Sequence, residues 1–156
     1  MDSKGVSPMI ATIVLIAIVF AVAAILALSL ASAPTPTQPF GGTFSLENVE
    51  NGKDVIVIKH MGGDKAVEAL IGTGSTPLAR WRNLELRVDG VVKDNIFEFV
   101  SEGKLYKTTT TQGTTYTLVV GDIVKVKLDS ALREGSKVVL VWVPRNQALV
   151  EKEVPR

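Results

Sequence analysis

The stretch Met9–Leu28, MIATIVLIAIVFAVAAILAL, decides the layout of this chain. Its 20 residues include one polar side chain, Thr12, and no charged one. A helix of this length rises about 30 Å, which matches the hydrocarbon core of a bilayer. Because the run is apolar on every side, such a helix has to be buried in lipid or among other helices. The sequence therefore predicts a helix at residues 6–32 that spans a membrane or packs against other helices.

The residues on either side of the apolar run set its limits. Ser7 and Pro8 suit the N-cap and the first turn, because serine accepts from a free amide and proline has no amide to leave unpaired. The segment 33–39 holds three prolines, and each disfavours helix in the residue before it. We therefore predict a semi-rigid Pro/Thr-rich linker at 33–39.

The overall composition excludes several classes of function. The 156 residues carry 17 basic and 16 acidic side chains, a balance that gives no electrostatic footprint for nucleic acid. The absence of cysteine excludes disulfides, thiolate metal sites and thiol catalysis. The single histidine, His60, excludes a multi-histidine metal site and disfavours a Ser-His-Asp triad. We expect no enzyme activity, no catalytic residue, no cofactor and no metal, which leaves a binding, membrane-associated or structural protein.

Residues 40–156 have the sequence pattern of a β domain. Turn signals such as Asp89-Gly90 and Glu102-Gly103 recur every 8–15 residues between runs rich in β-branched side chains. Strands are predicted at 54–59, 84–89, 95–100, 104–107, 116–120, 124–129, 136–143 and 147–154. We expect 54–59 to be buried on both faces and 136–143 to be central. The predicted fold is α+β by layout: one long N-terminal hydrophobic helix followed by an all-β, Ig-like sandwich at 40–156.

Three interpretations of the N-terminal segment are open. The first is a permanent single-pass anchor. The second is a secretory signal peptide cut after Ala31-Ser32-Ala33, which the long apolar core, the weak positive charge of Lys4 beside Asp2, and Pro34 after the cut all disfavour. The third is a class III signal peptide, in which the cut precedes the apolar helix and leaves it on the mature protein.

The third interpretation rests on the motif at Lys4–Ile10, KGVSPMI, directly before the apolar run. It resembles the class III signal peptide of archaeal type IV pilins, which a prepilin peptidase cuts after the small residue that follows a basic one. The resemblance implies a cut between Gly5 and Val6, so that 1–5 is the signal peptide. Bacterial type IV pilins carry glutamate at the fifth mature position, here Ile10, and archaeal ones commonly lack it. The segment His60–Asp64, HMGGD, also resembles an H-x-G-G-D element of archaeal pilin-like domains.

This resemblance implies a structural subunit of an archaeal pilus that serves adhesion and surface attachment. The precursor would lie in the cell membrane, and the mature chain would join copies of itself in an extracellular filament. Prepilin peptidase, an assembly ATPase and a membrane platform protein would be its partners. Residues expected in the filament core are Ile10, Ala17, Phe20 and Ala24. The alternatives are an anchored surface β domain that binds a glycan, a protein or a solute, and an archaellin.

Four features of the β domain are candidates for binding or structure. Arg80, Trp81 and Arg82 are expected on a loop, either as a surface contact or as a tryptophan that covers one edge of the sandwich. His60 is expected to form hydrogen bonds beside a turn, with Gly62-Gly63 supplying positive φ. Gly72–Ser75 lacks the ending of a phosphate loop and predicts a loop between strands. The threonines at 108–111, 114, 115 and 117 predict either a β-hairpin or a hydroxyl-rich surface for O-linked sugar or a polar ligand.

Overall fold

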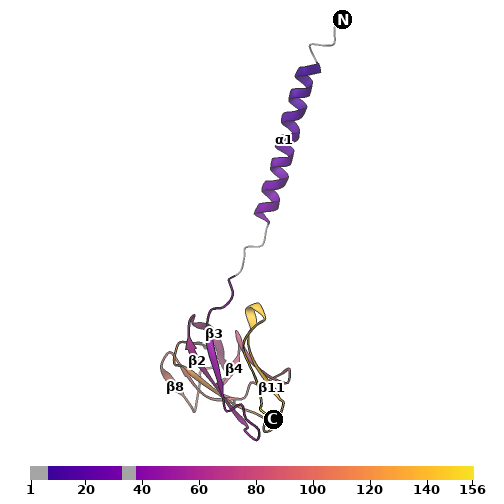
Figure 1. The fold of residues 1–156 in the computed structure, drawn as a ribbon. Coiled ribbons are helices and arrows are strands. Elements are labelled where there is room, and N and C mark those ends of the chain that lie inside the picture. Colours follow the sequence, from indigo (N-terminus) through magenta and orange to yellow (C-terminus); the bar gives the residue numbers. More distant parts are fainter. Residues whose placement is uncertain (1–6, 33–37) are drawn as a thin grey trace. The chain divides into compact units, whose positions relative to one another are not determined.

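The computed structural model describes residues 7–32 and 38–156. The chain divides into two compact units, one that ends at Gln38 and one that runs Pro39–Arg156. The first unit holds α1 (Ser7–Ala31), and the second, called here the β unit, is built almost wholly of strands (Figure 1). The predicted layout of one apolar helix followed by an all-β domain is confirmed.

Two hydroxyl side chains of the helix α1 are bonded to its own backbone. It has 25 residues and none is buried in the chain. The hydroxyl of Thr12 donates to the carbonyl oxygen of Pro8 at 2.8 Å, and that of Ser29 donates to Ile25 at 2.9 Å. A side-chain hydroxyl bonded to the preceding turn needs no outside partner, which suits a helix surrounded by hydrocarbon. In the part of the chain that the structure describes, α1 is the one helix long and apolar enough to cross a membrane.

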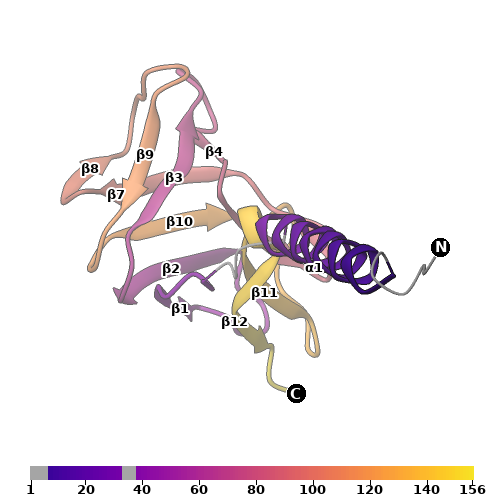
Figure 2. The same cartoon turned by 90° about the horizontal axis from the view of Figure 1, so that it is seen from above.

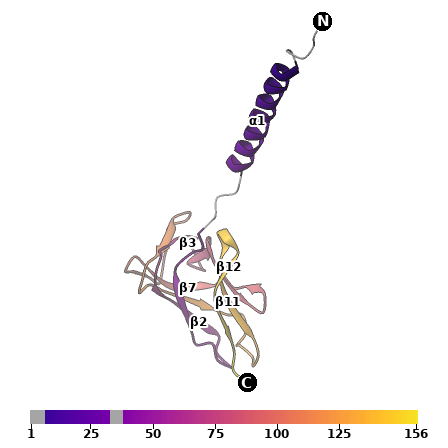
Figure 3. The same ribbon diagram turned by 45° about the horizontal axis from the view of Figure 1, so that its top comes forward.

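The β unit consists of two antiparallel sheets (Figures 2 and 3). The larger sheet runs in the order β1 (Thr43–Glu47), β2 (Val55–Gly62), β10 (Ile123–Lys127), β7 (Ile96–Ser101), β4 (Ala79–Trp81), β3 (Ala66–Gly72) and β9 (Thr115–Leu118), with β8 (Lys104–Tyr106) paired to β7. The smaller sheet runs in the order β12 (Gln147–Glu153), β11 (Lys137–Trp142), β5 (Leu84–Val88) and β6 (Val91–Val92). A 3-10 turn, η2 (Val143–Arg145), joins β11 to β12.

The two sheets share one core because alternate residues of their strands point between them. Fully buried side chains come from both sheets, among them Ile56, Ile58, Phe99, Val124, Leu84, Leu86, Val138 and Leu140. As predicted, β11 is central in its sheet, between β5 and β12. The expectation that residues 54–59 are buried on both faces is wrong. In β2, Ile56 and Ile58 are buried, whereas Val55 and Val57 are half-buried on the outer face.

Three strands were not predicted from the sequence. Strand β4 has three residues, too few for a clear period, and the five-residue β1 carries only two large apolar side chains, Phe44 and Leu46. Strand β3 loses its alternation at a β-bulge, because its register with β9 shifts between Ala66 and Leu70. Residues 79–81 form the strand β4 instead of the expected loop, so the prediction of a loop at Trp81 is wrong. Gly72–Ser75 does begin a connection between strands, as predicted.

Candidate functional surfaces

The expected filament-core residues lie on one side of α1. Ile10, Ala17 and Ala24 are spaced by seven residues, so they share one face of the helix, and Phe20 lies close to that face. The exposed fraction is 54% for Ile10 and 72% for Phe20. Small side chains at Ala17 and Ala24 allow a second helix to approach closely. Lys4, Gly5 and Val6, the residues of the expected cut, lie outside the described residues.

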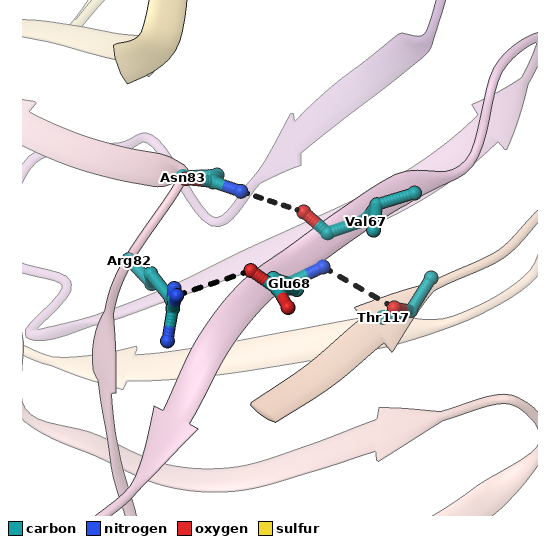
Figure 4. Close-up of polar contacts among 5 residues, drawn as sticks. All are labelled: Val67, Glu68, Arg82, Asn83 and Thr117. Atoms are coloured by element: carbon teal, nitrogen blue, oxygen red, sulfur yellow. Dashed lines mark hydrogen bonds and ion pairs between the residues drawn. The ribbon is translucent and has the colours of Figure 1, made fainter. Parts of the chain in front are cut away.

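The bulge in β3 is fixed by polar contacts with β9 and with the residues that follow β4 (Figure 4). Glu68 has a φ of +50°, in the left-handed region, and its amide donates to the hydroxyl of Thr117 at 3.2 Å. The side-chain amide of Asn83 donates to the carbonyl of Val67 at 3.0 Å. A guanidinium nitrogen of Arg82 lies 3.2 Å from the Glu68 carboxylate. Both charged side chains are almost half exposed, so this ion pair adds less than about 1 kcal/mol to the free energy of unfolding.

The strained backbone at Glu68 gives a matched pair of substitutions. Replacing Glu68 with valine should lower the free energy of unfolding of the β unit by about 2 kcal/mol, because a β-branched residue strongly disfavours positive φ. Replacing it with glycine should change that free energy by less than about 0.5 kcal/mol, because relief of strain offsets the lost ion pair. Denaturant unfolding followed by tryptophan fluorescence measures both. Equal destabilisation by the two substitutions would show that the φ of Glu68 is not a constraint.

Strand alternation separates Trp81 from its two arginines. Trp81 is half-buried against the core, and its indole N–H donates to the carbonyl of Lys93 at 2.6 Å. Arg80 is exposed and, one residue earlier on the strand, points to the opposite face. Arg82 is exposed and paired with Glu68. The ring and the guanidinium groups therefore do not form one contact surface, and Trp81 packs against the core from an interior strand of the larger sheet.

The HMGGD segment fastens the start of the β unit. The Nε2–H of the buried His60 donates to the carbonyl of Asp64 at 2.8 Å, whereas its Nδ1 has no hydrogen-bond partner within the described residues. The carboxylate of Asp64 accepts from the amide of Gly41 at 3.0 Å. Gly63 has a φ of +81°, and a Cβ there would lie 2.0 Å from the carbonyl oxygen of Gly41. Only glycine permits this close approach, so the segment is a structural clamp.

A second set of contacts fixes the start of the β unit, at Phe40, to the smaller sheet. The Phe40 ring stacks on Trp142 with centroids 4.3 Å apart. The amide of Phe40 donates to the side-chain oxygen of Gln147 at 2.9 Å, and the side-chain nitrogen of Gln147 donates back to the Phe40 carbonyl at 3.2 Å. The residues that follow the linker are thus bound to both sheets before β1 begins.

The buried carboxylate of Asp122 binds three backbone amides from two segments of the chain. Its Oδ2 accepts from the amides of Glu102 at 2.7 Å and Val119 at 2.8 Å, and its Oδ1 accepts from Gly103 at 3.2 Å. The residue is 2% exposed. Such a carboxylate replaces water for three amides at once, so it holds the β7–β8 turn against the chain between β9 and β10. Sequence analysis found the Gly121-Asp122 turn but not the buried role of its acid.

Neither a metal cluster nor a relative assigns an activity. Across residues 7–32 and 38–156, no group of three or more His, Cys, Asp or Glu side chains is placed to hold a metal ion. No protein-family model and no curated protein sequence matches the chain. A function therefore has to rest on α1, on the motif before it and on the surfaces of the β unit.

Proposed function

We propose that this protein is the subunit of an extracellular filament of the archaeal type IV pilus kind. A prepilin peptidase removes residues 1–5, α1 packs against copies of itself in the filament core, and the β unit forms the outer surface. The filament serves adhesion and surface attachment. The observation that carries this proposal is the motif KGVSP, whose Ser7 begins a helix of 25 residues that is apolar on all sides.

The composition of α1 supports a role both in lipid and in a filament. A helix that leaves the bilayer keeps its apolar surface out of water only if neighbouring helices replace the lipid. The face with Ile10, Ala17 and Ala24 combines small side chains with large apolar neighbours such as Phe20. Thr12 and Ser29 bond within their own helix and leave no donor that needs water. The same helix therefore suits both environments.

The independence of the β unit also supports the proposal. The unit Pro39–Arg156 has its own core and includes both tryptophans of the chain. A surface domain of this kind folds once and keeps its structure while the helix moves from membrane to filament. We expect a chain that starts at residue 38 to fold alone.

The N-terminal residue of the protein on the cell surface tests the proposal. We expect Val6, measured by intact mass or terminal sequencing. Replacing Gly5 with leucine should leave full-length precursor in the membrane and no filaments, because a bulky side chain blocks the close backbone approach that cleavage needs. Replacing Gly5 with alanine keeps a small residue at the cut and should leave most of the protein processed.

Other N-terminal residues would overturn the proposal. Met1 on the surface protein would identify a permanent membrane anchor with an outer β domain. Pro34 would identify a secreted domain released by an ordinary signal peptidase. Normal filaments from the Gly5→Leu variant would show that cleavage does not depend on this motif.

A further inference from the structure

A cleft between β8 and β9 combines an aromatic ring with polar side chains. Glu102, Lys104, Tyr106, Thr115, Tyr116 and Thr117 line it, and its volume is about 390 Å³. That volume lies within the range of small-molecule sites, about 300–1,000 Å³. Both strands are at sheet edges, since β8 pairs with β7 alone and β9 pairs with β3 alone (Figure 2). We propose that this cleft binds a neutral pyranose sugar.

The aromatic wall of the cleft is held rigidly. Tyr106 stacks on the buried Phe99 with ring centroids 4.9 Å apart and planes at 15°. Tyr116 meets both rings edge-on, at 66° to Tyr106 and 67° to Phe99. The half-buried Tyr106 is thus fixed on the core side by Phe99, and the ammonium of the exposed Lys104 lies over its ring, so a sugar reaches the ring face by displacing this flexible side chain. A fixed ring binds the C–H face of a sugar with little loss of side-chain entropy.

The β7–β8 turn provides one acceptor and one donor at the cleft. Glu102 and Gly103 form this turn, and their amides are held by the buried Asp122. The exposed Glu102 carboxylate has no ion pair in the described part of the chain. The ammonium of Lys104 lies 5.2 Å from the centre of the Tyr106 ring. A carboxylate can accept from two adjacent sugar hydroxyls, and the ammonium can donate to a third.

The strand β9 adds a hydroxyl donor, Thr117, beside the cleft. The Thr117 oxygen accepts from the amide of Glu68 at 3.2 Å, so its own hydrogen is left to donate. The neighbouring Tyr116 is buried and packs against the Phe99 and Tyr106 rings, so it contributes to the core side of the cleft. Ser101 on β7 donates to the Thr117 carbonyl at 2.7 Å and fixes β9 in place. The Thr117 hydroxyl is therefore held in place before any ligand arrives.

The balance of these groups favours a neutral sugar over a charged ligand. Glu102 and Lys104 contribute one charge of each sign, so the cleft gives no net attraction to an anion or a cation. A pyranose presents an apolar C–H face and several hydroxyls, and the cleft presents one ring and several hydroxyl partners. The proposal does not depend on filament assembly, because every group belongs to one β unit.

Saturation-transfer NMR on the full chain tests this site. The chain is held in micelles of a zwitterionic detergent that contains no sugar, and the probes are the methyl glycosides of glucose, galactose, mannose and N-acetylglucosamine. We expect at least one probe to bind with a Kd of about 1 mM, as suits a small ligand in an open cleft. Tyr106→Ala should weaken this binding at least about tenfold. Tyr106→Phe keeps the ring and should bind within about threefold of the natural chain.

Two controls separate a sugar site from a general change in the β unit. Leu105 is 49% exposed and lies on the other face of the same strand, so Leu105→Ala should leave sugar binding unchanged. Thermal unfolding of each variant shows that the domain is intact. The proposal would be overturned if none of the four glycosides, each at a concentration of about 10 mM, showed saturation transfer. It would also be overturned if Tyr106→Ala bound as tightly as Tyr106→Phe.

Discussion

Replacing Ala17 with glutamate is expected to abolish filaments. A charge near the middle of a membrane-spanning helix costs about 3 kcal/mol on insertion scales, and simulations give larger values. Ala17 lies close to the centre of α1, and α1 contains no basic residue that would pair with the new carboxylate. In a filament the same charge would recur in every subunit within an apolar core. Electron microscopy of sheared surface material measures the outcome.

A serine at the same position is the matched control. Ser29 and Thr12 already donate their hydroxyls to the carbonyl four residues earlier, and a serine at 17 would have the carbonyl of Ile13 in the same relation. Ala17→Ser should therefore assemble at close to the natural level. Membrane fractionation and protease resistance of the β unit separate failed assembly from failed insertion or folding. Abundant filaments from Ala17→Glu would contradict a helical core.

Replacing Asp122 with alanine is expected to lower the free energy of unfolding of the β unit by about 3 to 4 kcal/mol. The substitution leaves the amides of Glu102, Gly103 and Val119 without their acceptor, and the residue they surround is 2% exposed. Hydrogen bonds to a charged group contribute more than neutral ones, and buried donors without a partner are costly. Guanidinium unfolding of the chain from residue 38, followed by the fluorescence of Trp81 and Trp142, measures the change.

Two further variants show whether the carboxylate itself is responsible. Asp122→Asn keeps one acceptor oxygen and turns an amide nitrogen toward a backbone donor, so about half of the loss is expected. Asp129 is also acidic, but its side chain is 79% exposed and pairs with Lys93 at the surface. Asp129→Ala should change stability by less than about 0.5 kcal/mol. Equal effects of Asp122→Ala and Asp129→Ala would contradict a structural role for the buried acid.

The sequence was sufficient to predict those elements that are determined by the length of an apolar run or by the alternation of apolar and polar residues. The apolar run predicts α1 because nothing but a long helix buries twenty consecutive apolar residues without unpaired backbone. Alternation predicts β5 and β10, and the Asp89-Gly90 and Glu102-Gly103 turns predict the hairpins β5–β6 and β7–β8. These signals lie within short stretches of the chain, so a single amino-acid sequence is enough to recognise them.

The elements that sequence reasoning missed depend on contacts between distant residues. Strand β3 carries its bulge because Asn83 and Thr117, from other strands and turns, satisfy its backbone groups. At the cleft, the rings of Tyr106, Tyr116 and Phe99 contact one another, and no spacing in the sequence shows that meeting. Asp122 looked like an ordinary turn residue because two of its three donors, the amides of Glu102 and Gly103, come from a distant turn. Such sites are visible only once the sheet order is known.

Phe40–Gly42 contacts both sheets of the β unit, and this has a mechanical consequence. Tension applied through the residues before Phe40 reaches the β unit where one ring stack, two Gln147 bonds and the Gly41–Asp64 contacts act in parallel. Beyond them, β1 lies antiparallel to β2 over its whole length, so a pull along β1 loads those hydrogen bonds in shear. Bonds loaded in shear share the force, whereas peeling breaks them one by one. The segment Phe40–Gly42 therefore distributes an applied force over several contacts before the force reaches β1.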